Sequence, residues 1–253
     1  MAKHMHTDQQ RPLARVEPRL KVSELHAGYG NIPILFGLDF HVAPGELLGI
    51  MGHNGMGKTT LLRALMGHLP ATGGTISLDG VDITSMKPEH RARQGLGLVP
   101  QGRQIFASLS VLDNLRIGAV HLPRREAQHK VEAIIEELPR LKPILARTGG
   151  VLSGGEQQIL ALGRCLCAEP KLILLDEPTE GIQPSIVEEI AEFLRRLAGQ
   201  GELSIILVEQ DLAFISQLAT RVLTLRKGEL DNSVGPDALW APTNVADLTG
   251  LDQ

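Results

Sequence analysis

The sequence predicts an α/β protein built on a mostly parallel β-sheet flanked by helices. Strand-like and helix-like runs alternate along the 253 residues, a pattern typical of a parallel sheet covered by helices. A glycine-rich loop at residues 52–60 joins an apolar run to a helical run, a further mark of such folds. The length suits one large domain, or a domain with a subdomain, that buries a sizeable core.

Turn residues divide the first half of the chain into short strands. The expected strands are apolar runs near residues 20–25, 37–42, 47–51, 75–78 and 95–100. The run at 47–51 is apolar throughout, as is typical of a strand buried on both faces, and residues 61–66 indicate a helix directly after the glycine loop. Thr72-Gly73-Gly74 and Asp79-Gly80 predict turns on either side of the fourth strand.

The segment from Gln101 to about Gly150 differs from the rest of the chain. It is charged, has a helical pattern and is interrupted by Pro123, Pro139 and Pro143. Because proline ends or kinks helices, the segment predicts a helical insertion, not a continuation of the sheet. The expected organisation is a tail at 1–19, a domain at 20–235 with a helical subdomain at about 103–150, and a tail at 236–253.

Alternation of helices and strands resumes after the insertion. The expected elements are a helix at 155–168, a strand at 172–175, a helix that begins at Pro184, a strand at 205–208, and a hairpin formed by 221–225 and the Lys227-Gly228 turn. In the helix that begins at Pro184, Ile186, Ile190 and Leu194 recur at helical spacing, which predicts one buried face.

The glycine loop carries the first functional signal. It fits the pattern G-x-x-x-x-G-K-[ST] between a strand and a helix, the context that a phosphate-binding loop needs. Its glycines let backbone N–H groups turn toward an anion, and the helix adds its positive dipole end. Lys58 would reach the β- and γ-phosphates of a nucleotide, and the Thr59 hydroxyl would ligate Mg²⁺. The expected contacts are Gly52, Asn54, Gly55, Gly57, Lys58, Thr59 and Thr60.

Two acidic residues, Asp176 and Glu177, follow the apolar run at 172–175. A carboxylate at the carboxyl end of a buried strand beside a phosphate loop is well placed to hold Mg²⁺, directly or through water. Hydrolysis needs a base for the attacking water, and Glu177 lies next to the metal position. The pair would otherwise be a solvated strand end, but the phosphate loop upstream favours the catalytic interpretation.

A second candidate anion site lies at Ser153-Gly154-Gly155, directly before a predicted helix. Ser153 can cap that helix, and the glycines let backbone N–H groups approach a ligand closely. The chain thus has two helix N-termini suited to bind phosphate but only one nucleotide-binding loop. This suggests a dimer in which each nucleotide lies between the loop of one subunit and the second helix N-terminus of the other. An ordinary helix cap is the alternative for this segment taken alone.

Composition excludes several functional classes. The net charge of −4 argues against a nucleic-acid-binding surface, and one Trp, one Tyr and five Phe leave few stacking platforms. Cys165 and Cys167 face different sides of a helical run, so we interpret them as buried apolar residues in a reducing compartment. No apolar run approaches the roughly eighteen residues of a membrane span, and the N-terminus lacks a secretory pattern. We therefore expect a cytoplasmic protein.

Five segments, GHNGMGKTT, VPQGR, LSGGEQQ, LLDEPTEG and LVEQD, occur in this order between about residues 20 and 230. Together they resemble the ATP-binding subunits of ABC transporters. The resemblance implies a P-loop NTPase (RecA-like) fold with an N-terminal antiparallel β subdomain, with ATP and Mg²⁺ as cofactors. It also implies an ATP-hydrolysing head-to-tail dimer, in which the Ser153-Gly154-Gly155 element of one subunit faces the γ-phosphate held by the other.

The resemblance assigns roles to residues whose own pattern is weak. It implies that Tyr29 stacks on adenine, where composition alone indicates a surface aromatic. It implies that Gln101 touches Mg²⁺ and water and couples to a membrane partner, where a polar loop residue is the alternative. The implied catalytic residues are Lys58, Gln101, Glu177 and Gln210, and the implied metal ligands are Thr59, Gln101 and Asp176.

Two positions depart from the family pattern. Gln210 stands where the switch histidine is usual, and a glutamine amide donates hydrogen bonds but carries no titrating proton. Glu177 therefore gains weight as the base. Gln183 stands where an aspartate is common, so a cross-dimer contact there must be made differently.

The segments EGIQPS, LVEQ and VPQGR look like the second ATPase of uptake systems for branched-chain amino acids, urea and short-chain amides. This resemblance implies an ATPase that powers import of such a small polar solute. The implied partners are transmembrane permease subunits, a second ATPase chain or a second copy of this one, and a periplasmic solute-binding protein, with no nucleic acid. The implied place is the cytoplasmic face of the inner membrane. The alternative is a soluble ABC-type ATPase that acts as an assembly scaffold, for example in iron–sulfur cluster biogenesis.

Overall fold

The computed structural model describes residues 17–236 and 239. The predicted tails at 1–19 and 236–253 lie almost entirely outside the described residues. Within the described part of the chain, no helix combines the length and apolar character needed to cross a membrane.

The centre of the fold is a six-stranded sheet in the order β10-β9-β3-β8-β7-β6. Its strands are β3 (Leu47–Met51), β6 (Leu96–Val99), β7 (Leu172–Asp176), β8 (Ser204–Glu209), β9 (Arg221–Arg226) and β10 (Glu229–Val234). All neighbouring pairs are parallel except β9 and β10, which form a hairpin. This confirms the mostly parallel sheet that the alternating pattern predicts.

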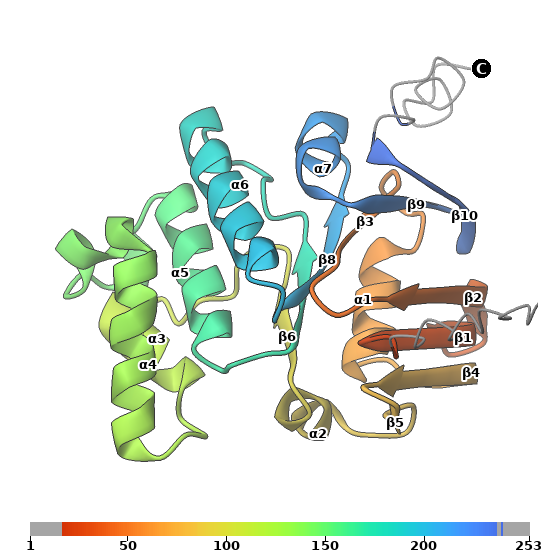
Figure 1. The fold of residues 1–253 in the computed structure, drawn as a ribbon, viewed down its shortest axis with the longest axis horizontal. Coiled ribbons are helices and arrows are strands. Elements are labelled where there is room, and N and C mark those ends of the chain that lie inside the picture. The colour runs from red at the N-terminus through yellow and green to blue at the C-terminus, as the bar shows by residue number, and fades with distance from the viewer. Residues whose placement is uncertain (1–16, 237–238, 240–253) are drawn as a thin grey trace, which may run out of the picture.

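Side chains of the central strands alternate between two cores. In β3, Leu47 and Met51 join one hydrophobic cluster, whereas Leu48 and Ile50 join the other. The first cluster is covered by helices α5 (Gly154–Leu166), α6 (Pro184–Gly199) and α7 (Leu212–Leu218). The second contains α1 (Lys58–Met66), which lies between the parallel sheet and a second sheet (Figure 1). Both faces of β3 are thus buried, as its uninterrupted apolar sequence predicts.

The second sheet is antiparallel and has the order β2-β1-β4-β5, with β1 (Leu20–Tyr29), β2 (Ile32–Val42), β4 (Ala71–Leu78) and β5 (Val81–Asp82). The prediction of a turn at Thr72-Gly73-Gly74 is wrong, because these residues lie inside β4. Gly73 pairs with His26 beside a register shift, and a Cβ on Gly74 would stand 2.1 Å from the Glu24 carbonyl oxygen. The glycines therefore permit a bulge between two closely paired strands.

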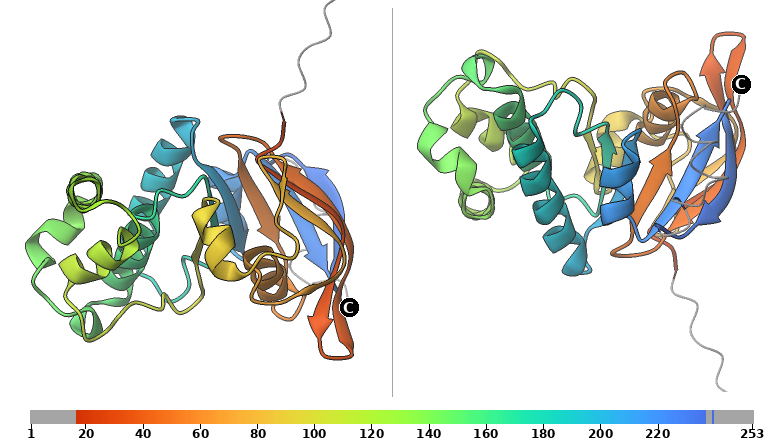
Figure 2. Two further views of the ribbon diagram at one scale, coloured as in Figure 1. Left: turned by 90° about the horizontal axis from the view of Figure 1, so that it is seen from below. Right: turned by 90° about the horizontal axis from the view of Figure 1, so that it is seen from above.

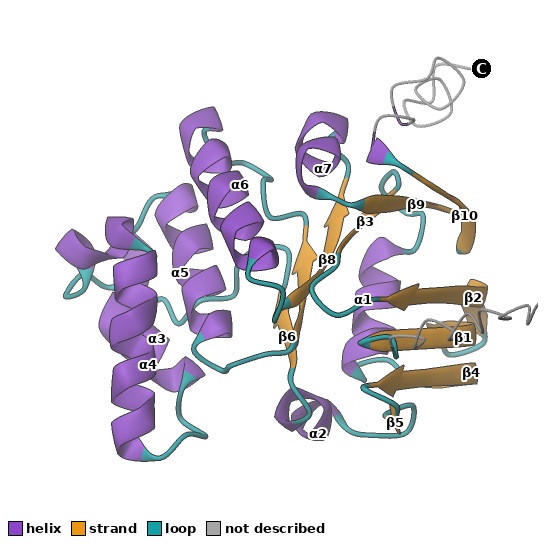
Figure 3. Cartoon of the chain, in the orientation of Figure 1, coloured by secondary structure: helices purple, strands orange, loops and turns teal. Residues whose placement is uncertain are grey.

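The segment after β6 is helical and projects away from both sheets (Figure 2). It contains α3 (Val111–Gly118), α4 (Arg124–Glu137), and the short 3-10 helices η1 (Pro139–Ile144) and η2 (Gly149–Val151). Gly163 of α5 lets this layer pack closely, since a Cβ there would meet Leu115, Ile134 and Leu138 at 3.0–3.3 Å. Helix α2 (Pro88–Arg93) precedes β6 in the chain. Figure 3 shows α5 and α6 on one side of the six-stranded sheet and α1 on the other. The exact limits of the helical subdomain stay a prediction.

Candidate active site

Parallel pairing brings three loops together at one edge of the sheet. Met51 is opposite Glu209, and Asp176 is opposite Val208. The glycine loop after β3, the acidic pair at the end of β7 and Gln210 after β8 therefore meet at the carboxyl ends of adjacent strands, where α/β proteins bind ligands.

The glycine loop turns from β3 directly into α1. Gly55 and Gly57 have φ values of 82° and 107°, in the left-handed region that favours glycine. Gly57 is the N-cap of α1 and has no side chain to satisfy the first N–H groups of the helix. Those N–H groups and the helix dipole are therefore left for a ligand anion, as the loop pattern predicts.

Lys58 is held inside this loop. Its Nζ donates to the main-chain oxygens of Gly52 and His53, at 2.6 and 3.0 Å, and lies 3.1 Å from Glu177 Oε1. The side chains of Lys58 and Glu177 are only 5% and 8% exposed. A buried ammonium and a buried carboxylate thus neutralise each other in this arrangement.

Three predicted site residues contact Glu177. Besides Lys58, its Oε1 accepts a bond from Gln210 Nε2 at 2.8 Å, and its Oε2 lies 3.4 Å from Gln101 Nε2. Gln210 Nε2 also donates to Asn54 Oδ1 at 3.0 Å. The glutamine that replaces the usual histidine is therefore in direct contact with the candidate base and with the glycine loop.

The residues predicted to hold Mg²⁺ also lie together. Thr59 Oγ1 donates to Asp176 Oδ2 at 3.3 Å. Burial raises the pKa of the Asp176 carboxyl, and the charge of Glu177 raises it further, against a bond from Thr59 and the charge of Lys58. The described residues contain no group of three or more His, Cys, Asp or Glu side chains suited to a metal. One carboxylate, one hydroxyl and an amide oxygen nevertheless fit Mg²⁺, which takes few protein ligands alongside phosphate and water.

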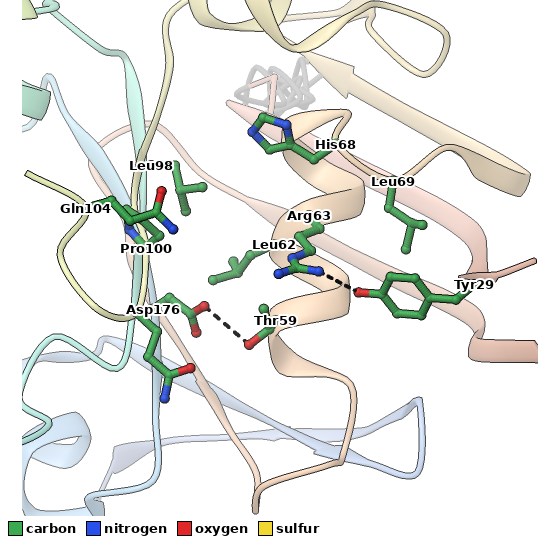
Figure 4. A pocket seen from close by; sticks show the side chains of 11 residues that line it. Tyr29, Thr59, Leu62, Arg63, His68, Leu69, Leu98, Pro100, Gln104 and Asp176 are labelled. Atoms are coloured by element: carbon green, nitrogen blue, oxygen red, sulfur yellow. Dashed lines mark hydrogen bonds between the residues drawn. The ribbon is translucent and has the colours of Figure 1, made fainter.

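A cavity of about 400 Å³ runs beside α1 from this point. Asp176, Thr59 and Gln101 are among its lining residues. In Figure 4 Asp176 and Tyr29 lie on opposite sides of α1. Tyr29 is 43% exposed, and its hydroxyl accepts a bond from Arg63 Nη1 at 3.3 Å. An exposed ring fixed at the edge of a cavity is available for stacking.

Ser153 and its glycines lie apart from the glycine loop, at the start of α5. Ser153 Oγ accepts from Glu156 N at 3.3 Å, and Glu156 Oε2 accepts from Ser153 N at 2.8 Å, so the two form a capping box. Among the described residues, no hydrogen bond or ion pair joins this element to Lys58 or Thr59. Within one chain the element is therefore a helix cap, and its predicted contact with a second subunit's nucleotide stays a prediction.

Two residues of the site, Glu209 and Thr179, were not predicted from the sequence. Glu209 is 3% exposed at the end of β8, and it accepts bonds from Thr179 in the loop after Glu177. The signal for Glu209 was present, since it follows an apolar strand as Asp176 does. Thr179 carries no signal of its own, because its partner is 30 residues away.

Residues 35–180 match the family model described as ABC transporter. The chain is 36% identical over 211 residues to the high-affinity branched-chain amino acid transport ATP-binding protein BraG of Pseudomonas aeruginosa, a match that covers 83% of this chain and 90% of that protein. It is 33% identical over 211 residues to a probable branched-chain amino acid transport ATP-binding protein, LivF, of Archaeoglobus fulgidus, with coverage of 83% and 89%.

Solved structures of ABC transporter proteins have a similar fold. A nucleotide-free ATP-binding cassette from an ABC transporter superposes with a TM-score of 0.81 at 25% identity, covering 90% of this chain and 98% of that one. The cbiO1 protein of Clostridium perfringens superposes with a TM-score of 0.80 at 28% identity, covering 93% and 95%.

Proposed function

This chain belongs to the ABC transporter family, and from that premise we propose that it powers import of urea, a short-chain amide or a branched-chain amino acid through membrane-spanning partners. As a member of the family it is an ATP-binding subunit of an import system and hydrolyses ATP. The observation that carries the hydrolytic part of the proposal is the convergence of Lys58, Gln101 and Gln210 on Glu177.

The choice of solute is supported by two kinds of similarity. BraG and LivF are both named for branched-chain amino acid transport. The segments EGIQPS and VPQGR favour the urea and amide branch. A sulfate/thiosulfate import protein of Mycobacterium tuberculosis is 34% identical over 227 residues, and an ATPase does not itself touch the solute. Partner identity, not the site, therefore decides the solute.

Nucleotide binding would rearrange the contacts of Lys58. We assign the phosphates to the N–H groups of residues 52–60 at the start of α1, where Lys58 exchanges Glu177 for the β- and γ-phosphates. Thr59, Asp176 and Gln101 would hold Mg²⁺, which supplies positive charge against the phosphate oxygens when it is bound. Tyr29 would stack on the adenine. Glu177, released from its ion pair, would then be free to orient a water molecule.

Proton transfer in this scheme is assigned to Glu177. Gln210 cannot exchange a proton, because an amide has no titrating group in the accessible range. Its Nε2 already lies 2.8 Å from Glu177 Oε1, so it would hold the base and donate toward the γ-phosphate. Glu177 would take the proton of the attacking water, and a positioned base contributes roughly 10²–10⁴-fold to such a step.

The capping element at the start of α5 would act on a second subunit. Ser153, Gly154 and Gly155 would contact the nucleotide held by a second copy of this chain or by a related ATPase. ATP would thereby close the dimer, and hydrolysis would reopen it. Gln101, which also donates to Glu180 Oε2 at 2.9 Å, would relay this movement toward the permease subunits.

The test is purification of the tagged chain from its own cells, followed by measurement of ATP hydrolysis with candidate solutes. We expect two multi-spanning proteins and a solute-binding protein to co-purify from membranes, and one solute among urea, acetamide and leucine to stimulate hydrolysis. Recovery with soluble partners alone, and no stimulation by any of the three, would favour the assembly-scaffold alternative.

A further inference from the structure

Glu209 is a buried carboxylate that the scheme above does not use. Its residue exposure is 3%, and among the residues that the structure describes no cation lies within ion-pair distance of it. Burial raises the pKa of the Glu209 carboxyl, and bonds from Thr179, Gln210 and Asp211 oppose that rise. A charge kept in the interior by hydrogen bonds alone is costly unless every donor is well placed.

The donors to Glu209 come from two different loops. Oε1 accepts from Thr179 Oγ1 at 2.6 Å and from Thr179 N at 3.2 Å. Oε2 accepts from Gln210 N at 2.9 Å and from Asp211 N at 3.4 Å. One carboxylate therefore joins the loop that follows Glu177 to the loop that begins with Gln210.

The backbone of Glu177 needs such support. Its φ is 47°, in the left-handed region, which is sterically unfavourable for a non-glycine residue. Strained conformations of this kind persist only when the surrounding structure fixes them. The N–H of Glu177 donates to Val208 O at 2.9 Å on one side, and Glu209 holds Thr179 on the other. The end of β8 therefore accepts hydrogen bonds from the backbone N–H groups of both Glu177 and Thr179.

We propose that Glu209 is a positioning residue of ATP hydrolysis, which holds the backbone of Glu177 in its left-handed conformation and in register with Gln210. Glu209 touches neither the nucleotide nor the attacking water in this account. Its carboxylate acts through Thr179 on one side and through the backbone of Gln210 on the other. The inference rests on the catalytic roles proposed for Glu177 and Gln210.

The isosteric variant Glu209→Gln tests this directly. An amide oxygen can still accept from one of the two loops, but the amide N–H₂ then faces the donors of the other loop. We expect kcat to fall by about 10- to 100-fold, the cost of misplacing a catalytic group by a fraction of an ångström to one ångström. The Kd for ATP should change by less than about twofold, because the glycine loop is intact. The kcat is to be calculated per ATP-binding molecule, so that unfolded protein does not lower it.

Glu46→Gln is the matched control. Glu46 is another largely buried carboxylate, with 12% side-chain exposure. It directly precedes β3, at the end of the strand away from the glycine loop. It accepts from Ala43 N at 2.6 Å and from Arg221 Nε at 2.9 Å. Substitution of a carboxylate with a purely structural role changes the melting temperature and leaves kcat per ATP-binding molecule unchanged. We expect that result for Glu46→Gln, and the same result for Glu209→Gln would overturn the proposal.

Thr179 supplies a second, independent measurement should Glu209→Gln fail to fold. Thr179→Val removes the 2.6 Å donor and keeps the shape, so kcat should fall, whereas Thr179→Ser keeps the hydroxyl and should restore it. In a double-mutant cycle the two losses should not add, because they break one connection. Additive losses, or Thr179→Val with the kcat of the wild type, would contradict the positioning role. A wild-type rate in Glu177→Gln would instead overturn the proposed function.

Discussion

Gln210 Nε2 lies 2.8 Å from Glu177 Oε1, and the same nitrogen lies 3.0 Å from Asn54 Oδ1. A single amide therefore connects the acidic end of β7 to the glycine loop after β3. Both acceptors are oxygens, so the amide donates on both sides and its orientation is determined. Since an amide does not titrate, this connection is insensitive to pH in the range where a histidine would change charge.

Gln210→His should make hydrolysis dependent on pH in a new way. Histidine has an ordinary pKa of about 6.5, and its protonated ring would form an ion pair with Glu177 that competes with the attacking water for that carboxylate. The kcat of the variant should therefore rise as pH increases through about 6–7, a limb that the wild type lacks. Gln210→Ala is the control, since it removes the amide without adding a titrating group. Normalised profiles of Gln210→His and wild type that superimpose would contradict proton handling at this position.

Glu177→Gln should bind ATP and hydrolyse it slowly. The amide keeps the size of the side chain but cannot take a proton, so kcat should fall by about 10²–10⁴-fold. The variant also removes the carboxylate that holds Lys58 at 3.1 Å, so ATP affinity should rise. The measurement is size-exclusion chromatography with and without ATP, in which the variant should accumulate a dimer. A monomer with full turnover would refute the role of Glu177 as base.

Local signals in the sequence were sufficient for the strands that carry the site. The loop after β3, the helix α1 and the acidic end of β7 were each predicted in place, because glycine spacing and apolar runs act over a few residues. ATP binding by the family is confirmed by the comparisons, whereas the roles of the single residues stay predictions.

The wrong turn and the missed contacts share a non-local cause. Gly73 and Gly74 favour a turn by composition, but pairing with β1 holds them in β4. The left-handed backbone of Glu177 and its contact with Lys58 depend on which strands are neighbours in the sheet. Thr179 and Glu209 meet across 30 residues of chain. No pattern along one segment reports a bond of that kind.

Cys165 and Cys167 should be unreactive in the folded protein. Cys167 is buried and Cys165 is half-buried against the same core. Burial raises the pKa of each thiol to about 12, so both stay protonated at ordinary pH and become thiolates only far above it. At pH 8 roughly one thiol in ten thousand is ionised, and the thiolate is the nucleophile. Iodoacetamide should therefore modify neither residue in native protein, as measured by intact mass, and both in guanidinium chloride. Rapid modification of native protein at pH 8 would contradict this burial.

Lys58→Ala should abolish ATP-dependent closure of the dimer. The ammonium group lies in the glycine loop, where it now pairs with Glu177 and with two main-chain oxygens. Its loss removes the cation expected at the β- and γ-phosphates, so kcat should fall by at least about 10²-fold, as for the removal of other preorganised charge-stabilising groups. Nucleotide titration and size-exclusion chromatography with ATP are the measurements.

Lys142→Ala is the control for this change, because Lys142 pairs with Glu136 at the surface of the helical layer, far along the chain from the loop. That variant should keep the turnover and ATP affinity of the wild type. The loss of the Lys58 charge also leaves Glu177 buried without its cation, so Lys58→Ala should be less stable in the absence of nucleotide, by an amount that the double variant with Glu177→Gln recovers. Ordinary ATP affinity together with ordinary turnover in Lys58→Ala would remove the basis for assigning the phosphates to this loop.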